Sequence, residues 1–361
     1  MLVNYFVGER ESRMTGVGRY RKMIYTLLKD KVDFNLIEYE ALPIIAPFQR
    51  YVLYPLTVKR KLRDGIVHIT GQQQSYLLHE INPDRSIVTV YDVFNLYVRE
   101  DPKLRSELRK NQGFIDYHFF MFETNAWSKA LVKAKRIIAI SEFTKNEITK
   151  KLGYPKEQID VTHLGVDTKM YKPLKNFKPP KTLTEKIILH VGGSELRENT
   201  NVLLKALYKV KKKISEIKLI KIGSAGKEFL NLAAELNLIK NITCIGHVSE
   251  KDLPAYYNSA DVLVYPSIYE GFGLPPLEAM ACGLPAVTSN VAALPEVVGD
   301  AGIMKNPNDV EGFANAIYSV LTDDGLREAL IEKGLKRAKK FSWEKTAKRT
   351  LEIYREVYEQ K

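Results

Sequence analysis

The most informative part of this 361-residue sequence is the stretch 265–283, which reads Tyr-Pro-Ser-Ile-Tyr-Glu-Gly-Phe-Gly-Leu-Pro-Pro-Leu-Glu-Ala-Met-Ala-Cys-Gly. It begins at the end of the apolar run 260–265, whose length and β-branched content are typical of a buried strand. Two prolines, Pro275 and Pro276, then favour the start of a helix, which the run Leu-Glu-Ala-Met-Ala continues. The stretch therefore predicts a strand, a glycine-rich loop and a helix, in that order.

This strand–loop–helix corner has the chemistry of a phosphate site. Gly271 and Gly273 let backbone amides approach a ligand closely, and the helix N-terminus adds a partial positive charge. Glu270, before the loop, is expected to face whatever the phosphate carries. Glu278, expected in the first helical turn, is suited to accept hydrogen bonds from a vicinal diol such as a ribose. The alternative is an ordinary corner with acids at a helix start.

The two glutamates and the residues between them, Glu-Gly-Phe-Gly-Leu-Pro and Glu-Ala-Met-Ala-Cys-Gly-x-Pro, resemble the motif of the retaining glycosyltransferases of family 4. The resemblance spans nearly the whole chain. It implies the α/β GT-B fold, in which two doubly wound, Rossmann-like parallel sheets face a cleft. We expect an N-terminal acceptor-binding domain over residues 1–172, a C-terminal nucleotide-sugar-binding domain over residues 173–343, and a terminal helix over residues 344–361 that packs back on the N-terminal domain.

Length and composition set further bounds. The chain is too long for one hydrophobic core, which also predicts two domains. No stretch approaches the roughly 18–20 apolar residues that span a bilayer, and the N-terminus runs into a strand-like segment without a basic leader, so a cytoplasmic location is expected. The two cysteines, Cys244 and Cys282, exclude a disulfide framework, and no Cys/His cluster has metal-ligand spacing; no metal or other cofactor is expected.

The net charge of +12 bears on partners. The plainer interpretation is a lysine-rich solvated surface. The sharper one is a face that attracts phosphate-bearing substrates or anionic lipids, with peripheral contact on the inner face of the cell membrane. Aromatic residues crowd into the segment 104–134, which is predicted to be helical; they indicate core, with a lipid-facing patch as the alternative. No recognisable nucleic-acid module is present, so nucleic acid is not an expected partner.

Two places in the N-terminal half are predicted to face ligands. Gly16 and Gly18 stand at a helix start soon after a strand, which suits close approach to an anion, although a simple turn is the alternative. The second place is the end of the strand 86–91, because ligands bind beyond the carboxyl ends of parallel strands. Relatives often carry His-Asp there, but here Tyr91 occupies the histidine position. Tyr91 and Asp92 are the acceptor-side candidates, with an N-cap or turn role as the alternative for Asp92.

The C-terminal half contains one departure from the family pattern, in the loop 192–199, which reads Gly-Gly-Ser-Glu-Leu-Arg-Glu-Asn. Relatives ordinarily carry Arg-Lys-Asn here, and its two cations hold the donor diphosphate. Arg197 is able to grip a phosphate through two hydrogen bonds. Glu198 replaces the lysine and should weaken diphosphate binding unless its side chain turns away or another cation compensates. The variant E198K is accordingly expected to bind a diphosphate equally well or more tightly.

The resemblance then implies a full set of site residues. The catalytic candidates are Glu270, which would hold the sugar hydroxyls or the oxocarbenium-like face, and Asp92. The donor-binding candidates come from the glycine-rich loops, the loop with Arg197, a loop that encloses the base, and the central motif: Gly16, Gly18, Gly192, Arg197, His247, Val248, Phe272, Gly273, Leu274 and Glu278.

The resulting hypothesis is a metal-independent, retaining glycosyltransferase. It would move a hexose, mannose or glucose, from a GDP- or UDP-sugar to a glycan or lipid-linked glycan; retention comes from the resemblance alone. Glu198 motivates a second hypothesis, a catalytically weak nucleotide-sugar-binding or regulatory protein of the same fold. A Rossmann dehydrogenase is disfavoured, because Arg21 stands where a Gly-x-Gly-x-x-Gly fingerprint starting at Gly16 needs its third glycine.

Overall fold

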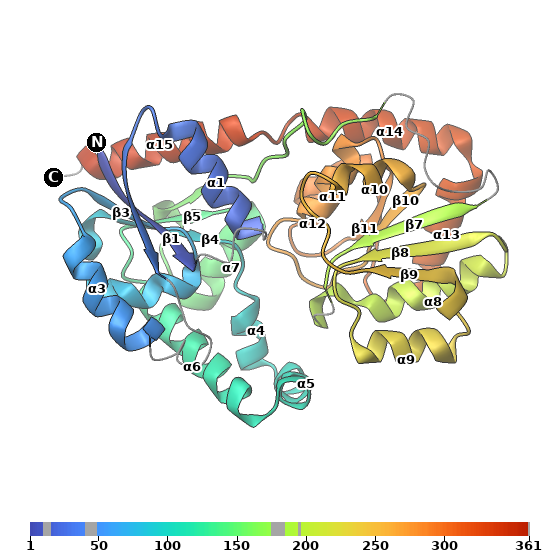
Figure 1. Ribbon diagram of the computed structural model, residues 1–361, viewed down its shortest axis with the longest axis horizontal. Helices are drawn as coiled ribbons and strands as arrows, with labels where there is room; N and C mark the ends of the chain where they lie inside the picture. The colour runs from blue at the N-terminus through green and yellow to red at the C-terminus, as the bar shows by residue number, and fades with distance from the viewer. Residues whose placement is uncertain (10–15, 40–48, 175–184, 194–195, 360–361) are drawn as a thin grey trace. The chain divides into compact units, whose positions relative to one another are not determined.

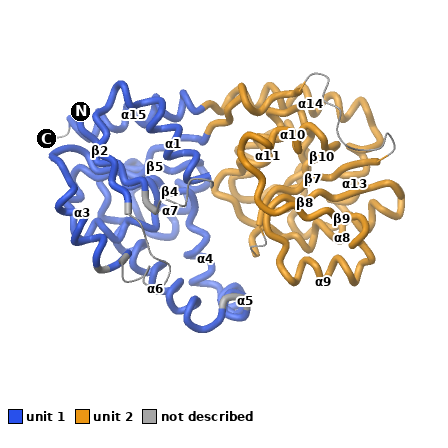
Figure 2. Tube along the Cα trace, in the orientation of Figure 1, with its two compact units in different colours: residues 1–164, 343–361 blue, residues 165–342 orange. Residues whose placement is uncertain are grey.

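The structure, a computed structural model, describes residues 1–9, 16–39, 49–174, 185–193 and 196–359. It divides into two compact units (Figure 2). Unit 1 comprises residues 1–164 and 343–361, and unit 2 comprises residues 165–342. Each unit contains a six-stranded sheet, so the predicted architecture of two α/β halves is confirmed.

The sheet of unit 1 has the strand order β2-β1-β3-β4-β5-β6, and all of its pairs are parallel. Strands β3 and β4 are buried along their whole length, which explains their runs of isoleucine and valine. The order changes direction between β1 and β3, which is where ligands bind in such sheets. The strands are β1 (Leu2–Glu9), β2 (Asp33–Tyr39), β3 (Ile66–Ile69), β4 (Ser86–Val90), β5 (Arg136–Ala139) and β6 (Ile159–Val161).

The helices of unit 1 begin and end where the sequence supplies caps. The Ser141 hydroxyl accepts from the Thr144 amide at 3.0 Å and caps α7. Gly113, with φ of 82°, ends one helix and precedes the next, so the segment 104–134 forms two helices. The helices are α1 (Gly16–Leu28), α3 (Tyr54–Lys61), α4 (Phe94–Glu100), α5 (Pro102–Gln112), α6 (Phe114–Leu131), α7 (Glu142–Leu152) and α15 (Trp343–Glu359), with the 3-10 helix η4 (Gln72–His79). None of the described helices is long and apolar enough to cross a membrane.

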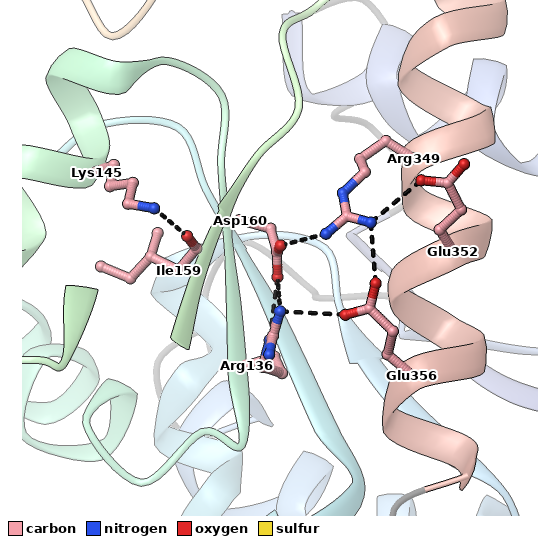
Figure 3. A network of polar contacts seen from close by, with 7 residues as sticks. All are labelled: Arg136, Lys145, Ile159, Asp160, Arg349, Glu352 and Glu356. Atoms are coloured by element: carbon pink, nitrogen blue, oxygen red, sulfur yellow. Dashed lines mark hydrogen bonds and ion pairs between the residues drawn. The ribbon is translucent and has the colours of Figure 1, made fainter. Parts of the chain in front are cut away.

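Helix α15 is far from the rest of unit 1 in sequence but belongs to it, and a polar network holds it there (Figure 3). Asp160 of β6 accepts from Arg349 of α15 at 2.6 Å and from Arg136 of β5. Arg349 also donates to Glu356 at 2.9 Å. On the apolar side of the same helix, Tyr354 is fully buried. Four half-buried charges and a buried tyrosine therefore attach α15 to the sheet.

The sheet of unit 2 has the order β12-β11-β10-β7-β8-β9, again with parallel pairs throughout. Its core lies between the sheet and α8 and α13. The strands are β7 (Lys186–Val191), β8 (Ile217–Ile222), β9 (Ile242–Ile245), β10 (Val262–Tyr265), β11 (Ala286–Ser289) and β12 (Ile303–Lys305). The helices are η7 (Leu196–Glu198), α8 (Thr200–Lys211), α9 (Lys227–Glu235), α10 (Leu253–Ser259), α11 (Leu274–Ala281), α12 (Leu294–Val298), α13 (Val310–Thr322) and α14 (Asp324–Ala338) (Figure 1).

Candidate active site

The predicted motif lies at the carboxyl edge of the unit 2 sheet. Strand β10 ends at Tyr265, whose hydroxyl donates a hydrogen bond to Oε1 of Glu270 across 2.9 Å. Burial raises the pKa of Glu270 to about 7, and the charge of Glu198 adds to the shift, whereas Arg197 and the Tyr265 hydroxyl oppose it. Glu270 is thus a carboxyl group that titrates near neutral pH, with the charges of Arg197 and Glu198 acting on it in opposite directions.

The loop between Glu270 and α11 requires glycine at its last position. Gly273 has φ of 111°, and a Cβ there would lie 2.8 Å from Cδ2 of Leu294. The two residues that follow Leu274, Pro275 and Pro276, have no N–H. The amides nearest to this helix start are consequently those of Gly273 and Leu274, together with the preceding residue.

That preceding residue, Phe272, has a structural side chain. It is buried, and its ring packs edge-on against Phe341 with centroids 5.6 Å apart. The side chain is therefore part of the packing, which leaves the backbone of Phe272 as the part suited to a ligand.

Glu278 differs from the prediction in its place on the helix. Helix α11 begins at Leu274 and has no acidic residue in its first turn, so the expected first-turn position is wrong. With about 3.6 residues per turn, Glu278 falls in the second turn. It is buried, and Oε2 accepts a hydrogen bond from the Tyr257 hydroxyl at 2.7 Å. The carboxylate is therefore oriented by a neighbouring helix, α10.

The Arg-Glu-Asn segment is hydrogen-bonded to two loops at this edge, the loop after β10 and the loop after β12. The carbonyl of Arg197 accepts from the Ile268 amide at 2.7 Å, which ties the turn to the loop that carries Glu270. Asn199 has φ of 53°, and its side-chain amide donates to the carbonyls of Pro266 at 3.0 Å and Pro307 at 2.7 Å. Arg197 is thereby held beside the β10 loop by a backbone hydrogen bond of its own and by the side-chain hydrogen bonds of Asn199.

The Glu198 side chain turns inward, toward the sheet. It is 8% exposed, Oε1 accepts from the Gly193 amide at 2.6 Å, and Oε2 lies 3.8 Å from Nε2 of His190. Burial opposes its ionisation, but the His190 imidazole, the Gly193 amide and the charge of Lys221 together lower the pKa of Glu198 below its usual value. The side chain is thus turned inward, which was one of the two conditions under which a glutamate was expected to be tolerated here.

Lys221 of β8 is the second cation, and the sequence analysis missed it. Its side chain is fully buried, and Nζ donates to the carbonyls of Gly192 at 3.0 Å and Gly193 at 2.7 Å. Burial lowers the pKa of Lys221, against the opposing effect of the Glu198 charge. A signal was available: Lys221 follows Leu219 by two residues, and alternate residues of a strand share one face.

The other donor-side candidates of unit 2 lie at the same edge. Gly192 stands directly beside Glu198, since a Cβ there would lie 2.8 Å from Oε2 of that residue. The Gly192 amide donates to the Ile222 carbonyl at 3.0 Å, so it is engaged within the sheet. His247 is exposed and Val248 half-buried in the loop after β9. A planar base would find an accessible side chain and backbone groups there.

The candidates of unit 1 divide into backbone and buried groups. Gly16 and Gly18 lie in the first turn of α1, and Gly18 is buried. Tyr91 is buried, and its hydroxyl donates to the Thr70 carbonyl at 2.9 Å. Asp92 is half-buried, and its Oδ1 accepts from the Phe94 amide at 3.0 Å, which is the turn role weighed for it.

Unit 1 also contains a buried polar network that no pattern in the sequence predicts. His68 is fully buried, with Nδ1 2.6 Å from the Tyr354 hydroxyl and Nε2 2.8 Å from Oγ1 of Thr89. Burial lowers the pKa of His68 to about 3, so the imidazole is neutral at physiological pH. Arg21 extends the network, because its Nε donates to Oγ1 of Thr70 at 2.6 Å.

The candidates thus form two groups, one at the carboxyl edge of each sheet. Unit 2 brings together Glu270, Arg197 and Gly192, whereas Tyr91 and Asp92 lie in unit 1. Across the described ranges, no cluster of three or more His, Cys, Asp or Glu side chains is placed to hold a metal ion. The groups available for chemistry are the Arg197 guanidinium, backbone amides, and carboxyl groups whose pKa values differ.

Known proteins are similar to this chain in sequence and in architecture. Residues 172–337 match the family glycosyl transferases group 1, and residues 43–170 match glycosyltransferase family 4. The chain is 33% identical over 315 residues to O-antigen chain mannosyltransferase B of Escherichia coli, which covers 84% of this chain and 78% of that protein.

Solved structures with the same architecture are more distant in sequence. Sucrose-phosphate synthase from Thermosynechococcus elongatus has a TM-score of 0.80 at 19% identity, covering 99% of both chains. Anabaena HepE, in complex with UDP and glucose, has a TM-score of 0.78 at 15% identity, covering 99% of this chain and 100% of that one. At these identities the likeness is one of fold.

Proposed function

Since the chain belongs to the group 1 glycosyltransferases, with the GT-B fold that its sequence predicts, we propose that it transfers a hexose from a nucleoside-diphosphate sugar to a glycan or a lipid-linked glycan. The observation that carries this proposal is the placement of Glu270 in the loop after β10. The Tyr265 hydroxyl holds its carboxyl group, and the Arg197 guanidinium is close enough to oppose the rise in its pKa. A cation for the diphosphate and a carboxyl for the sugar then lie side by side.

The proposed chemistry follows from where charge develops. Breaking the bond between sugar and phosphate leaves negative charge on the diphosphate, so a fixed cation and fixed amides stabilise the transition state more than the ground state. Arg197 and the amides of residues 272–274 supply this stabilisation without a metal. Glu270 holds the sugar hydroxyls or the oxocarbenium-like face, and Glu278, oriented by Tyr257, holds the ribose.

The acceptor side completes the proposal. Asp92 orients the acceptor, and a departing phosphate oxygen takes the acceptor's proton, so that the protein needs no separate general base. Retention of configuration is proposed from the family resemblance. Mannose and glucose are the favoured sugars and GDP and UDP the favoured carriers, because one relative is named a mannosyltransferase and one structural neighbour holds UDP and glucose.

Transfer from labelled donors tests the proposal. Purified protein is incubated with GDP-[14C]mannose or UDP-[14C]glucose and with a lipid-linked glycan fraction, with and without EDTA, and the E270Q variant is run in parallel. Labelled product that forms in EDTA and depends on Glu270 is expected, and NMR of its anomeric proton reports retention. No product from either donor, together with a raised melting temperature in GDP or UDP, would favour the catalytically weak nucleotide-sugar-binding protein instead.

A patch on α5 and α6 supports peripheral contact with an anionic membrane. Phe114, Ile115 and Phe122 of α6 are 62%, 80% and 53% exposed. The guanidinium of Arg109, in the last turn of α5, lies 5.7 Å from the centre of the Phe114 ring, and Lys110 follows it. Apolar side chains beside exposed cations suit an anionic bilayer surface, so we place the protein in the cytoplasm, at the inner face of the membrane.

Vesicle sedimentation tests this location. The protein is expected to sediment with vesicles that contain anionic phospholipid and to remain free with zwitterionic ones. The variant I115E should abolish sedimentation, whereas L230E, at an exposed leucine of α9 in unit 2, is the matched control and should not. Equal sedimentation of I115E and the parental protein would rule out the patch.

A further inference from the structure

Two buried charges hold a single peptide group from opposite sides. The peptide between Gly192 and Gly193 directs its N–H to Oε1 of Glu198 at 2.6 Å, and its C=O accepts from Nζ of Lys221 at 3.0 Å. No cis peptide occurs among the described residues, and in a trans peptide the N–H and C=O point in opposite directions. The carboxylate and the ammonium therefore lie on either side of the same peptide plane, and Lys221 reaches the next carbonyl, that of Gly193, at 2.7 Å.

The signs of the charges match the peptide dipole. The N–H end is positive and faces the carboxylate, and the C=O end is negative and faces the ammonium, so both contacts are charge-assisted hydrogen bonds. Glu198 is 8% exposed and Lys221 is 0% exposed, and a buried charge without its counterpart is strongly destabilising. Neither residue is expected to be tolerated in its present state without the other, although Glu198 in η7 and Lys221 in β8 are 23 positions apart in the chain.

This arrangement lies next to the residues of the donor site. Arg197 precedes Glu198 in the same turn, and its carbonyl holds the loop that carries Glu270. The Glu198 charge acts on Glu270, whose pKa it raises. Without a cation to offset it, the same charge would also oppose an incoming diphosphate at Arg197.

We propose that Lys221 is a positioning residue for donor binding, which offsets the charge of Glu198 and with it fixes the Gly192–Gly193 peptide. Arg197 then meets a diphosphate without an uncompensated anion beside it. The inference rests on the proposed function in one respect, that the ligand is a nucleoside diphosphate. Related sequences carry a lysine at position 198 and have no glutamate charge there to offset. In this chain Lys221, a residue of strand β8, offsets that charge.

The proposal reverses the expectation for E198K that the sequence alone supported. A lysine at position 198 would leave the Gly193 N–H without its acceptor and would add a second cation close to Lys221. E198K should therefore melt at a lower temperature and bind nucleoside diphosphate less tightly. Removing Lys221 as well, in E198K/K221M, should restore binding, because the new lysine is then free to turn toward the ligand.

The test compares K221M, E198Q, E198Q/K221M, E198K and E198K/K221M by melting temperature and by calorimetric titration with GDP and UDP. K221M should weaken binding about tenfold and melt lowest of the neutralising variants, since it leaves Glu198 unbalanced. E198Q/K221M should melt above K221M and bind within about threefold of the parental protein, since the glutamine still accepts from Gly193. The matched control is K218M, at a partly exposed lysine of the same strand that pairs with Glu185, and it should change neither quantity.

The two readouts separate this inference from the proposed function. If E198Q/K221M melts no higher than K221M, or if K221M binds like the parental protein, the compensation is overturned. If the parental protein binds neither nucleotide, the proposed function fails, but the order of the melting temperatures still decides whether Lys221 and Glu198 act as a pair.

Discussion

The hydroxyl of Tyr265 and Oε1 of Glu270 are joined by a hydrogen bond of 2.9 Å at the end of β10. The hydroxyl donates and the carboxylate accepts, so the orientation of the carboxyl group is set by the strand that precedes it. Glu270 lies in the loop after β10, and this hydrogen bond ties its carboxyl group to the more rigid strand, which suits a residue that must meet a developing charge.

The first prediction concerns Glu270 itself. E270Q keeps the shape of the side chain and an acceptor for Tyr265 but removes the negative charge. Turnover should fall by a factor of about 100 or more, while the KM for the donor should change by less than about threefold, because the interaction is made mainly in the transition state. Steady-state kinetics on the labelled donor measure both. An equal loss in turnover and donor affinity would contradict the role.

The second prediction uses the pKa of Glu270, which burial raises to about 7 from an ordinary value of 4.5. Between these two values the folded protein binds more protons than the unfolded chain, so the free energy of unfolding falls as the pH rises from about 4.5 to about 7. The loss amounts to about 3 kcal/mol at alkaline pH. Denaturant unfolding of E270Q should match the parental protein near pH 5 and exceed it above pH 8. Parallel curves for the two proteins would show that Glu270 ionises normally.

The third prediction tests Arg197. R197A should weaken binding of a nucleoside diphosphate by a factor of about 10–100, which corresponds to the loss of charge-assisted hydrogen bonds worth about 1.5–3 kcal/mol. Binding of the nucleoside without phosphates should not change. Calorimetric titration with both ligands is the measurement, and equal weakening for the two would place Arg197 away from the phosphates.

The fourth prediction concerns Glu278, which Tyr257 orients at 2.7 Å. If Glu278 holds the ribose, the parental protein should bind a ribonucleoside diphosphate about tenfold more tightly than the 2′,3′-dideoxy analogue. E278Q should remove most of this preference, and Y257F should reduce it in part. A preference that persists in E278Q would leave Glu278 with only a packing role.

The fifth prediction concerns the attachment of α15. D160N replaces a carboxylate that accepts from Arg349 at 2.6 Å and from Arg136, and it should lower the free energy of unfolding by about 1.5–3 kcal/mol. Both tryptophans of the chain, Trp127 and Trp343, belong to unit 1, so intrinsic tryptophan fluorescence reports this unit. An unchanged fluorescence melting curve in D160N would show that the network contributes little. The exposed pair variant D64N, at a carboxylate beside Arg85, is the control.

Sequence and structure agree where the information is local. The strand, loop and helix around Glu270 follow from β-branched residues, glycines and prolines within twenty positions, and the Ser141 cap follows from its own segment. The two parallel sheets that the family resemblance implied are also present.

The differences arise where distant residues meet. The orientation of Glu198 depends on Lys221, which comes from the neighbouring strand, and nothing in the loop itself encodes it. Tyr91 is buried, and its hydroxyl donates to the carbonyl of Thr70, the residue that follows β3. The order of elements along the chain does not predict this contact. Part of the aromatic segment expected in the core is exposed, because the break at Gly113 directs the start of α6 outward.

The place of α15 has a consequence for biosynthesis. Residues 1–164 of unit 1 precede unit 2 in the chain, yet the partners of His68 and Asp160, Tyr354 and Arg349, are translated after all of unit 2. Unit 2 is one continuous segment and is able to fold while the earlier unit is still incomplete, which inverts the usual N-terminal-first order. A nascent chain that has emerged from the ribosome as far as residue 342 should therefore present a folded second unit and an N-terminal unit in which His68 and Asp160 still lack their partners from α15.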